Sequence, residues 1–251
     1  MSRATGRRVV FVGATRGMGR ALSRRLAERG DRLCLLGRDA EALRRAADDL
    51  GVRGACPPPA QIPCDLADPT MFDPALDAAQ ADLGRLDVVI VTAGLFATQE
   101  ALEDDPALLA RVLDVNVRGT VLLCEAAKRR MLAAGGGALV VFSSVAGARA
   151  RSSNVLYGAT KAALSAYLEG LDHRHHRDGL RVLDVKPGFV RTSMTAGLRE
   201  PPFAGEPDQV ARDVERALDR DAAVVFTPRA WGPVMSVVRR LPRAVMRRAR
   251  F

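Results

Sequence analysis

Short runs of β-branched and apolar residues alternate with longer segments of helical periodicity along most of the chain. The runs are continuous rather than alternating, which is typical of strands buried on both faces. They occupy residues 8–13, 32–37, 60–64, 86–94, 138–144, 180–185 and 222–227. Segments of helical length lie between them, at residues 18–29, 39–50, 69–82, 106–133, 156–178 and 207–219. This alternation predicts a doubly wound α/β fold with a seven-stranded parallel sheet.

The length of the chain adds a prediction about domains. The 251 residues, 48% of them hydrophobic, can form one large core. We find no long linker and no internal repeat, and the stretches ACPPPA and AAGGGA are typical of loops. We therefore expect a single domain over residues 1–227, followed by a tail over residues 228–251.

The formal charge of +9 is concentrated in that tail. From Ala222 onward there are seven arginines and no acid, which leaves +2 for the first 221 residues. A nucleic-acid partner would be favoured by basic residues spread over the domain or along a helix. We therefore expect no nucleic-acid partner for the main domain.

The tail also has an apolar pattern. Its apolar residues recur at three- or four-residue steps between the arginines, at Trp231, Met235, Val238, Leu241 and Val245. A basic amphipathic segment with a tryptophan is typical of an element that lies on a membrane surface. Pro233 and Pro242 break it into short pieces, which argues against one long surface helix. The alternative is a tail folded over the pocket or onto a partner subunit, with solvated arginines. Both interpretations stay open.

Apolar runs and cysteines indicate the cellular compartment of the protein. No apolar run approaches the 18 or more residues of a membrane span, and the apolar start is read as a first strand rather than a signal peptide. Four cysteines without CxxC spacing favour reduced thiols. We expect a cytoplasmic protein, with peripheral contact at the inner face of the membrane as an open alternative.

A glycine-rich loop follows the first strand. In GATRGMGRAL, the residues Gly13, Gly17 and Gly19 precede a helix. Glycine allows a tight turn and a close approach of the backbone to a pyrophosphate, which the free N–H groups of the helix N-terminus then bind. Between a first strand and a first helix this loop predicts a Rossmann-type dinucleotide site.

The end of the second strand indicates which dinucleotide. An acid there would bind the ribose hydroxyl, whereas Arg38, helped by Arg16 in the glycine loop, can bind a 2′-phosphate. NADPH is therefore favoured over NADH. Asp39 argues against this, unless its carboxylate is occupied as a helix N-cap. Asp65, after the third strand, is either an adenine contact or a loop residue.

The pentapeptide YGATK places Tyr157 and Lys161 four residues apart, on one face of a helix. An ammonium beside a phenol favours the phenolate, so we expect Lys161 to lower the pKa of Tyr157 and make it an acid or base near neutrality.

Several motifs occur in one characteristic order: GATRGMG, CDL, VTAG, the asparagine of DVNVRG, SSVAG, YGATK and KPGFVRT. With them the chain resembles the short-chain dehydrogenase/reductase family over nearly its whole length. It departs from the family pattern at Val12 and at Val91 with Thr92, where the usual residues tie strands together.

The resemblance implies a role for each catalytic residue. Tyr157 is expected to be the general acid/base, and Lys161 to lower its pKa and bind the nicotinamide ribose. Ser144, thirteen residues before Tyr157, would polarise the substrate oxygen, and Asn116 would hold a helix kink and a water that links Lys161 to solvent. The expected cofactor contacts are Gly13, Thr15, Arg16, Gly17, Met18, Gly19, Arg38, Asp65, Leu66, Ala93, Gly94, Tyr157, Lys161, Pro187, Gly188, Val190 and Thr192.

The expected pocket is mostly apolar. Its walls are Leu95, Phe96, residues 145–155, Phe189 and residues 193–207, which suit a hydrophobic or lipid-linked ketone. The last hundred residues resemble the decaprenylphosphoryl-2-keto-ribose reductase branch, which implies a polyprenyl-phosphate keto sugar. A 3-ketoacyl or 3-keto-sphingoid lipid remains an alternative. So does a catalytically silent, cofactor-binding sensor, against which the complete catalytic set argues.

Two further expectations concern metals and subunits. His173 and His176 have helical spacing but no carboxylate or thiol ligand evident nearby, so we expect no metal site, and Gly179 is typical of a helix end. The resemblance implies a homodimer or homotetramer that pairs through the helices at 106–133 and 156–178.

Overall fold

The computed structural model describes residues 6–55 and 57–248. Its centre is a seven-stranded sheet in the order β3-β2-β1-β4-β5-β6-β7, with every neighbouring pair parallel. The strands are β1 (Arg8–Val12), β2 (Arg32–Gly37), β3 (Ala60–Pro63), β4 (Val88–Val91), β5 (Gly137–Phe142), β6 (Leu180–Pro187) and β7 (Val224–Thr227). The predicted doubly wound, single-domain α/β fold is confirmed.

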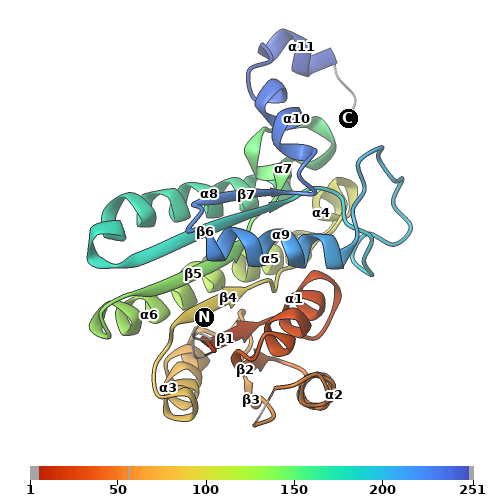
Figure 1. Cartoon of the computed structure of the whole chain (residues 1–251). Coiled ribbons are helices and arrows are strands. Elements are labelled where there is room, and N and C mark those ends of the chain that lie inside the picture. Colours follow the sequence, from red (N-terminus) through yellow and green to blue (C-terminus); the bar gives the residue numbers. More distant parts are fainter. Residues whose placement is uncertain (1–5, 56, 249–251) are drawn as a thin grey trace.

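Helices cover both faces of the sheet (Figure 1). One apolar core lies between the sheet and α1 (Gly17–Glu28), α2 (Ala40–Val52) and α9 (Pro207–Asp219). The other lies between the sheet and α3 (Phe72–Leu83), α6 (Thr120–Ala133) and α8 (Val155–His175). Burial on both faces explains why the strands are continuous apolar runs.

The strand order changes direction between β1 and β4. β1 pairs with β2 on one side and with β4 on the other, so the loops after β1 and β4 diverge at the carboxyl edge of the sheet. In open parallel sheets, ligands bind at this switch point. The glycine loop and residues 92–98 both lie there.

The long helix predicted at 106–133 has three parts: α5 (Pro106–Leu113), a π-helical segment η2 (Asp114–Gly119) and α6. Inside η2, the Asn116 side chain is bonded to the backbone of Leu95, and Gly119 lies so close to the Leu66 carbonyl that a Cβ would be 1.8 Å from its oxygen. A packed contact and a side-chain bond thus account for the interruption.

Short helices were not predicted at four places. These are α4 (Gln99–Asp104), α7 (Val145–Ala148) in a predicted pocket wall, and α10 (Trp231–Val238) and α11 (Arg243–Arg248) in the tail. Single turns also occur at η1 (Pro69–Met71), η3 (Ser152–Asn154) and η4 (His176–Asp178), and η4 ends at Gly179 with φ 85°. Pro242 separates the two tail helices, but Pro233 is accommodated in the first turn of α10.

No helix within residues 6–55 and 57–248 combines the length and apolar character needed to cross a lipid bilayer. Cys34, Cys64 and Cys124 are free and buried, and burial raises the pKa of each thiol. Cys56 lies outside the described residues.

Candidate active site

The glycine loop makes a cradle that a side chain would fill. Gly13 has φ 96°, and a Cβ on it would lie 2.7 Å from the backbone nitrogen of Ala93. A Cβ on Gly19 would lie 2.0 Å from the Gly13 carbonyl oxygen, and one on Gly17, with φ 50°, would lie 3.2 Å from the Thr192 methyl group. The loop therefore requires glycine at these positions and packs against the segments after β4 and β6.

Thr92 fastens this cradle. Its hydroxyl donates to the carbonyl oxygens of Gly13 (2.9 Å) and Val12 (3.2 Å), so it ties the end of β4 to the end of β1. The motif analysis treated Thr92 only as a departure from the family pattern. Its position supplies a link between the strands.

The remaining predicted cofactor residues lie along the same edge. Thr15, Met18, Ala93 and Gly94 are partly exposed there, and Val190 is buried in a bridge to Gly205. Leu66 is 5% exposed with its side chain in the core, so that side chain is not available to a ligand.

The structure brings Tyr157 and Lys161 together at the start of α8. The Lys161 ammonium lies 5.8 Å from the centroid of the Tyr157 ring and donates to the Phe142 carbonyl (3.0 Å) at the end of β5. Phe96 packs edge-on against Tyr157, with 5.0 Å between ring centroids. The phenol is thus fixed between an aromatic wall and an ammonium.

Ser144 and Asn116 complete the cluster. Ser144 caps α7, accepting from the Ala146 N–H (3.0 Å), and its hydroxyl donates to the Pro187 carbonyl (3.4 Å) while lying close enough to Tyr157 to lower the pKa of the phenol. Asn116 accepts from the Leu95 N–H (2.7 Å) and donates to the Leu95 carbonyl (2.8 Å). A Cβ on Gly94 would lie 3.2 Å from the Asn116 oxygen and 3.5 Å from the Lys161 ammonium. All four predicted catalytic residues therefore gather at one place.

Burial controls the pKa values here. Desolvation raises the pKa of Tyr157 to about 12, against the hydrogen bond with Ser144, which lowers it. Desolvation also lowers the pKa of Lys161 to about 8, against the carboxylate of Asp184, which raises it. The expected lowering of the Tyr157 pKa by Lys161 is therefore not found, because the ammonium faces the ring and the burial of both groups outweighs their pairing.

In the glycine loop and after β2, Arg16 and Arg38 are exposed, and among the described residues neither pairs with a carboxylate. Asp39 caps α2 by accepting from the Ala42 N–H (2.9 Å), as the sequence analysis required for a 2′-phosphate site. Asp65 accepts from the Ala67 N–H (3.0 Å), so it has a turn-forming role in this state.

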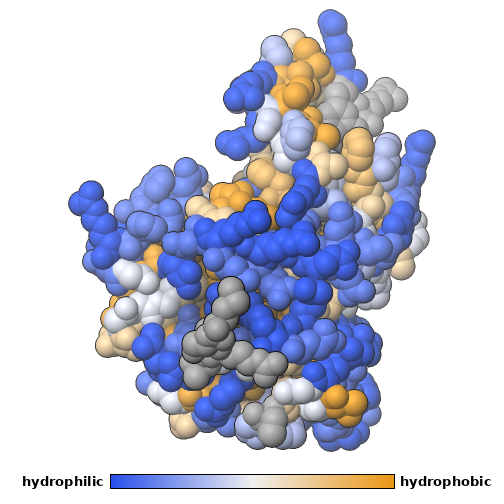
Figure 2. Space-filling model, viewed as in Figure 1, coloured by the Kyte–Doolittle hydropathy of each residue, from blue (hydrophilic) through white to orange (hydrophobic). Residues whose placement is uncertain are grey.

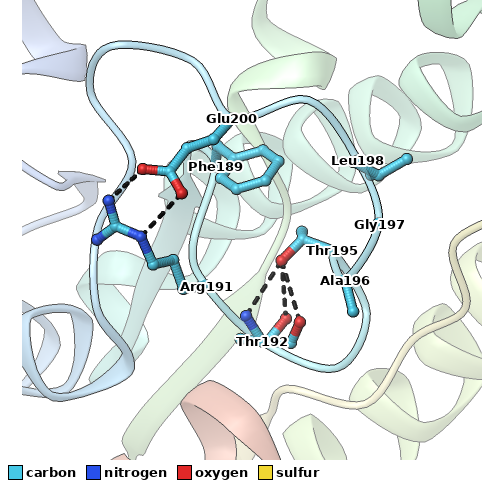
Figure 3. A pocket seen from close by; sticks show the side chains of 8 residues that line it. All are labelled: Phe189, Arg191, Thr192, Thr195, Ala196, Gly197, Leu198 and Glu200. Atoms are coloured by element: carbon cyan, nitrogen blue, oxygen red, sulfur yellow. Dashed lines mark hydrogen bonds and ion pairs between the residues drawn. The ribbon is translucent and has the colours of Figure 1, made fainter.

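The segment after β6 forms the outer wall. It encloses a cavity of about 380 Å³ (Figure 3). Thr195 donates to the Val190 carbonyl (2.6 Å), and Arg191 pairs with Glu200 and Glu206, so these contacts fix the shape of the loop. The lining residues are Phe189, Arg191, Thr192, Thr195, Ala196, Gly197, Leu198 and Glu200. None of the four catalytic residues lines it, and Thr192 joins it to the glycine loop.

The first tail helix folds back onto this wall. The Trp231 indole lies on Gly188, where a Cβ would be 2.0 Å from its nitrogen, and donates to the Phe203 carbonyl (3.1 Å). Arg149 donates to the Leu241 carbonyl (2.6 Å), which ties the end of α10 to the segment after α7. Helix α11 has no buried residue.

Two features of the site were not predicted. Gln99 of α4 accepts from the Leu156 N–H (3.1 Å) and so caps the start of the catalytic helix. Asp184 and Lys186 form a buried ion pair on β6. Gln99 carries no sequence signal, but an acid and a base two residues apart inside an otherwise apolar strand, in LRVLDVKP, could have been noticed.

The comparison with known families decides the identity. The family profile for short chain dehydrogenase matches residues 7–202. The chain belongs to the short-chain dehydrogenase family. It is an oxidoreductase, and the fold of this family binds NAD or NADP.

Relatives agree with this assignment. An uncharacterized oxidoreductase of Streptomyces coelicolor is 37% identical over 246 residues, covering 96% of this chain and 95% of the relative. Carbonyl reductase family member 4 of Xenopus tropicalis is 30% identical over 210 residues, covering 80% and 86%. A crystal structure of a short-chain type dehydrogenase/reductase from Mycobacterium marinum has the same fold, with a TM-score of 0.82 at 24% identity, covering 90% and 96%.

Proposed function

We propose that this short-chain dehydrogenase is an NADPH-dependent carbonyl reductase. The observation that carries the proposal is the gathering of Ser144, Tyr157, Lys161 and Asn116 beside a glycine cradle at the carboxyl edge of the sheet. The bound dinucleotide supplies the hydride to the carbonyl carbon. The Tyr157 phenol gives its proton to the carbonyl oxygen, so the C=O bond becomes CH–OH.

The other residues prepare this proton transfer. The Ser144 hydroxyl orients and polarises the carbonyl oxygen. Lys161 stabilises the phenolate left on Tyr157, and Asn116 holds the backbone beside it, so that a proton can return through water. The high pKa of Tyr157 suits an acid that stays protonated until the carbonyl oxygen gains charge.

The preference for NADPH rests on Arg16 and Arg38. Both guanidiniums are exposed at the adenosine end, and the nearby Asp39 carboxylate is engaged by α2. A 2′-phosphate would therefore meet two cations, each contact worth about 1.5–3 kcal/mol.

We propose a hydrophobic substrate that carries an anionic group, such as a lipid-linked phosphate. Arg151 supports this. It lies in the loop between Ser144 and Tyr157, its Nε is buried, and it has no hydrogen-bond partner among the described residues. Burial lowers the pKa of Arg151, with no carboxylate to compensate. A substrate phosphate would supply the missing partner.

The tail supports a lipid-linked substrate as well. Figure 2 shows apolar side chains over the end of the molecule that carries α10 and α11, with hydrophilic ones projecting around them. Val237 and Val245 are 62% and 47% exposed. We propose that α10 closes the substrate loop while α11 touches anionic lipid through its arginines, about 1 kcal/mol each.

We also propose a homo-oligomer, as the family resemblance implies. Leu113 at the end of α5 and Leu122 on α6 are 45% and 41% exposed, and Val155 at the start of α8 is 51% exposed. These apolar residues lie on the helices where subunits of this family pair.

The test is NADPH consumption with a panel of ketones in detergent: polyprenyl-phosphate keto sugars, 3-ketoacyl lipids and 3-keto-sphingoid lipids. Tyr157→Phe should abolish ketone-dependent oxidation while leaving NADPH binding intact. The matched control is Tyr167→Phe, which removes the only other tyrosine. Undiminished turnover in Tyr157→Phe would exclude Tyr157 as the acid.

Arg151→Met separates the substrate classes. It should raise KM for phosphate-bearing ketones by tenfold or more, from the roughly 1.5–3 kcal/mol of a charged hydrogen bond, and leave KM for neutral ketones unchanged. Equal effects on both would remove the argument for an anionic substrate.

A further inference from the structure

A cluster of buried polar residues lies between the sheet and helix α8. Along β5 and β6 the residues on this face are apolar as far as Val141 and Val182. Beyond them come Ser143, Asp184 and Lys186, which are 3%, 4% and 7% exposed. Charged residues are rarely buried to this degree without partners, so these side chains need a structural or functional reason.

The cluster satisfies its own charges. The Ser143 hydroxyl donates to one carboxylate oxygen of Asp184, and the Lys186 ammonium donates to the other. Lys186 also donates to the hydroxyl of Ser165 on α8. Ser165 lies one turn after Lys161, so the cluster fastens β6 to the catalytic helix directly behind the catalytic lysine.

The cluster also acts on Lys161. The carbonyl that accepts from Lys161 belongs to Phe142, the residue before Ser143. Burial lowers the pKa of Lys161, and the Asp184 carboxylate is the charge that opposes this. Among the described residues, the charged or titratable groups that act on Lys161 are Tyr157 on its own helix and Asp184 on β6, and Asn116 of η2, close by, is neutral.

We propose that Asp184 and Lys186 are positioning residues of the active site: Asp184 is the counter-charge of Lys161, and Lys186 pairs with Asp184 and joins it to α8. The catalytic meaning of this rests on the proposed function, but the effect on Lys161 does not. A buried cation in an apolar site loses its proton unless an anion is near. Without the Asp184 charge, Lys161 would be neutral near physiological pH and could not stabilise a phenolate.

The test removes both charges together, because replacing a whole buried ion pair disturbs folding less than breaking it. Asp184→Asn/Lys186→Met is compared with the native pair. In each background, the free energy of urea unfolding is measured across pH for chains with Lys161 and with Lys161→Met. Within one background, the pH at which the difference in unfolding free energy between the Lys161 and Lys161→Met chains begins to shrink reports the ionisation of Lys161 in the folded chain. We expect it to move down by about 1 pH unit in the double variant.

Asp213→Asn is the matched control. Asp213 is another buried aspartate, 5% exposed and paired with Arg229, but it lies on α9, which covers the opposite face of the sheet. Its loss should lower stability without moving the ionisation of Lys161. If the double variant does not fold, Asp184→Val/Lys186→Leu, which replaces the whole pair by apolar side chains, carries the same expectation.

The proposal is overturned if Lys161 of the double variant ionises at the same pH as in the native pair, or if Asp213→Asn changes that pH by the same amount. Because unfolding needs no substrate, a chain without reductase activity would refute the proposed function and leave this result standing. In an active enzyme, the basic limb of the pH profile of ketone reduction should move down with Lys161, which a purely structural role would not produce.

Discussion

Replacing Lys161 with methionine should make the protein more stable at neutral pH while abolishing its activity. Lys161 is 5% exposed, and its pKa falls from 10.5 to about 8 because the ammonium is desolvated. That difference corresponds to roughly 3 kcal/mol by which the charged form disfavours the folded chain. Methionine has a similar length and carries no charge, so it avoids this cost.

Part of the gain is lost with the hydrogen bond to the Phe142 carbonyl. A charged hydrogen bond contributes about 1.5–3 kcal/mol, so we expect Lys161→Met to gain about 1 kcal/mol net at pH 7. For a chain of this size, that corresponds to a rise in Tm of about 2–4 °C.

The direction in which native stability changes with pH follows from the pKa of Lys161 in the folded and unfolded chains. Between the folded pKa of about 8 and the unfolded value of 10.5, the unfolded chain binds more protons than the folded one, so native stability rises with pH through this window. The advantage of Lys161→Met should therefore be full below pH 8 and should disappear as the pH approaches 10.5. Urea unfolding followed by circular dichroism at successive pH values measures it.

Lys186→Met is the matched control, because Lys186 is equally buried but directly paired with Asp184. Removing one partner of a buried pair should destabilise the chain by about 3–5 kcal/mol, the opposite sign. The reasoning is refuted if Lys161→Met is less stable than the native chain at pH 7, or if its effect does not vary between pH 7 and pH 10.

Three other predictions concern the cofactor, the tail and assembly. Arg38→Asp should raise the Kd for NADPH by tenfold or more, in line with about 1.5–3 kcal/mol for a charged contact, and change the Kd for NADH little; equal losses in a fluorescence titration would remove the 2′-phosphate argument. Deletion after Thr227 should lower sedimentation with anionic vesicles, most strongly at low salt, and unchanged binding would favour a tail that only covers the substrate loop. Leu122→Glu should shift the chain toward monomer in sedimentation velocity, whereas an unchanged distribution would place the subunit contact elsewhere.

The fold could be predicted because buried parallel strands leave a strong pattern. Every strand and every long helix lay within a few residues of its predicted position, and the start and end of α9 were predicted without error. Periodicity alone did not predict the break in the helix at 114–119, since it depends on how Asn116 and Gly119 meet residues distant in sequence, although the family resemblance implied a kink at Asn116. Short helices such as α4 and α7 are stabilised by tertiary contacts that periodicity does not record.

The site was predictable where local spacing sets the geometry. Tyr157 and Lys161 face one another because residues four apart share a helix face, and the family resemblance added Ser144 and Asn116. The electrostatics were not predictable, because the effect of an ammonium on a phenol depends on how deeply both are buried. The presence of the Asp184 charge near Lys161 depends on the register of β5 and β6, which the sequence pattern does not give.

The central claim is that Tyr157 and the nicotinamide flank the same carbonyl. A crystal structure of the complex with NADP⁺ tests it most directly. We predict that the nicotinamide lies between the residues after β4 and β6, with the Tyr157 hydroxyl and the Ser144 hydroxyl both directed at one point beside its hydride-bearing carbon. A nicotinamide bound elsewhere, or a Tyr157 phenol turned away from it, would contradict the account.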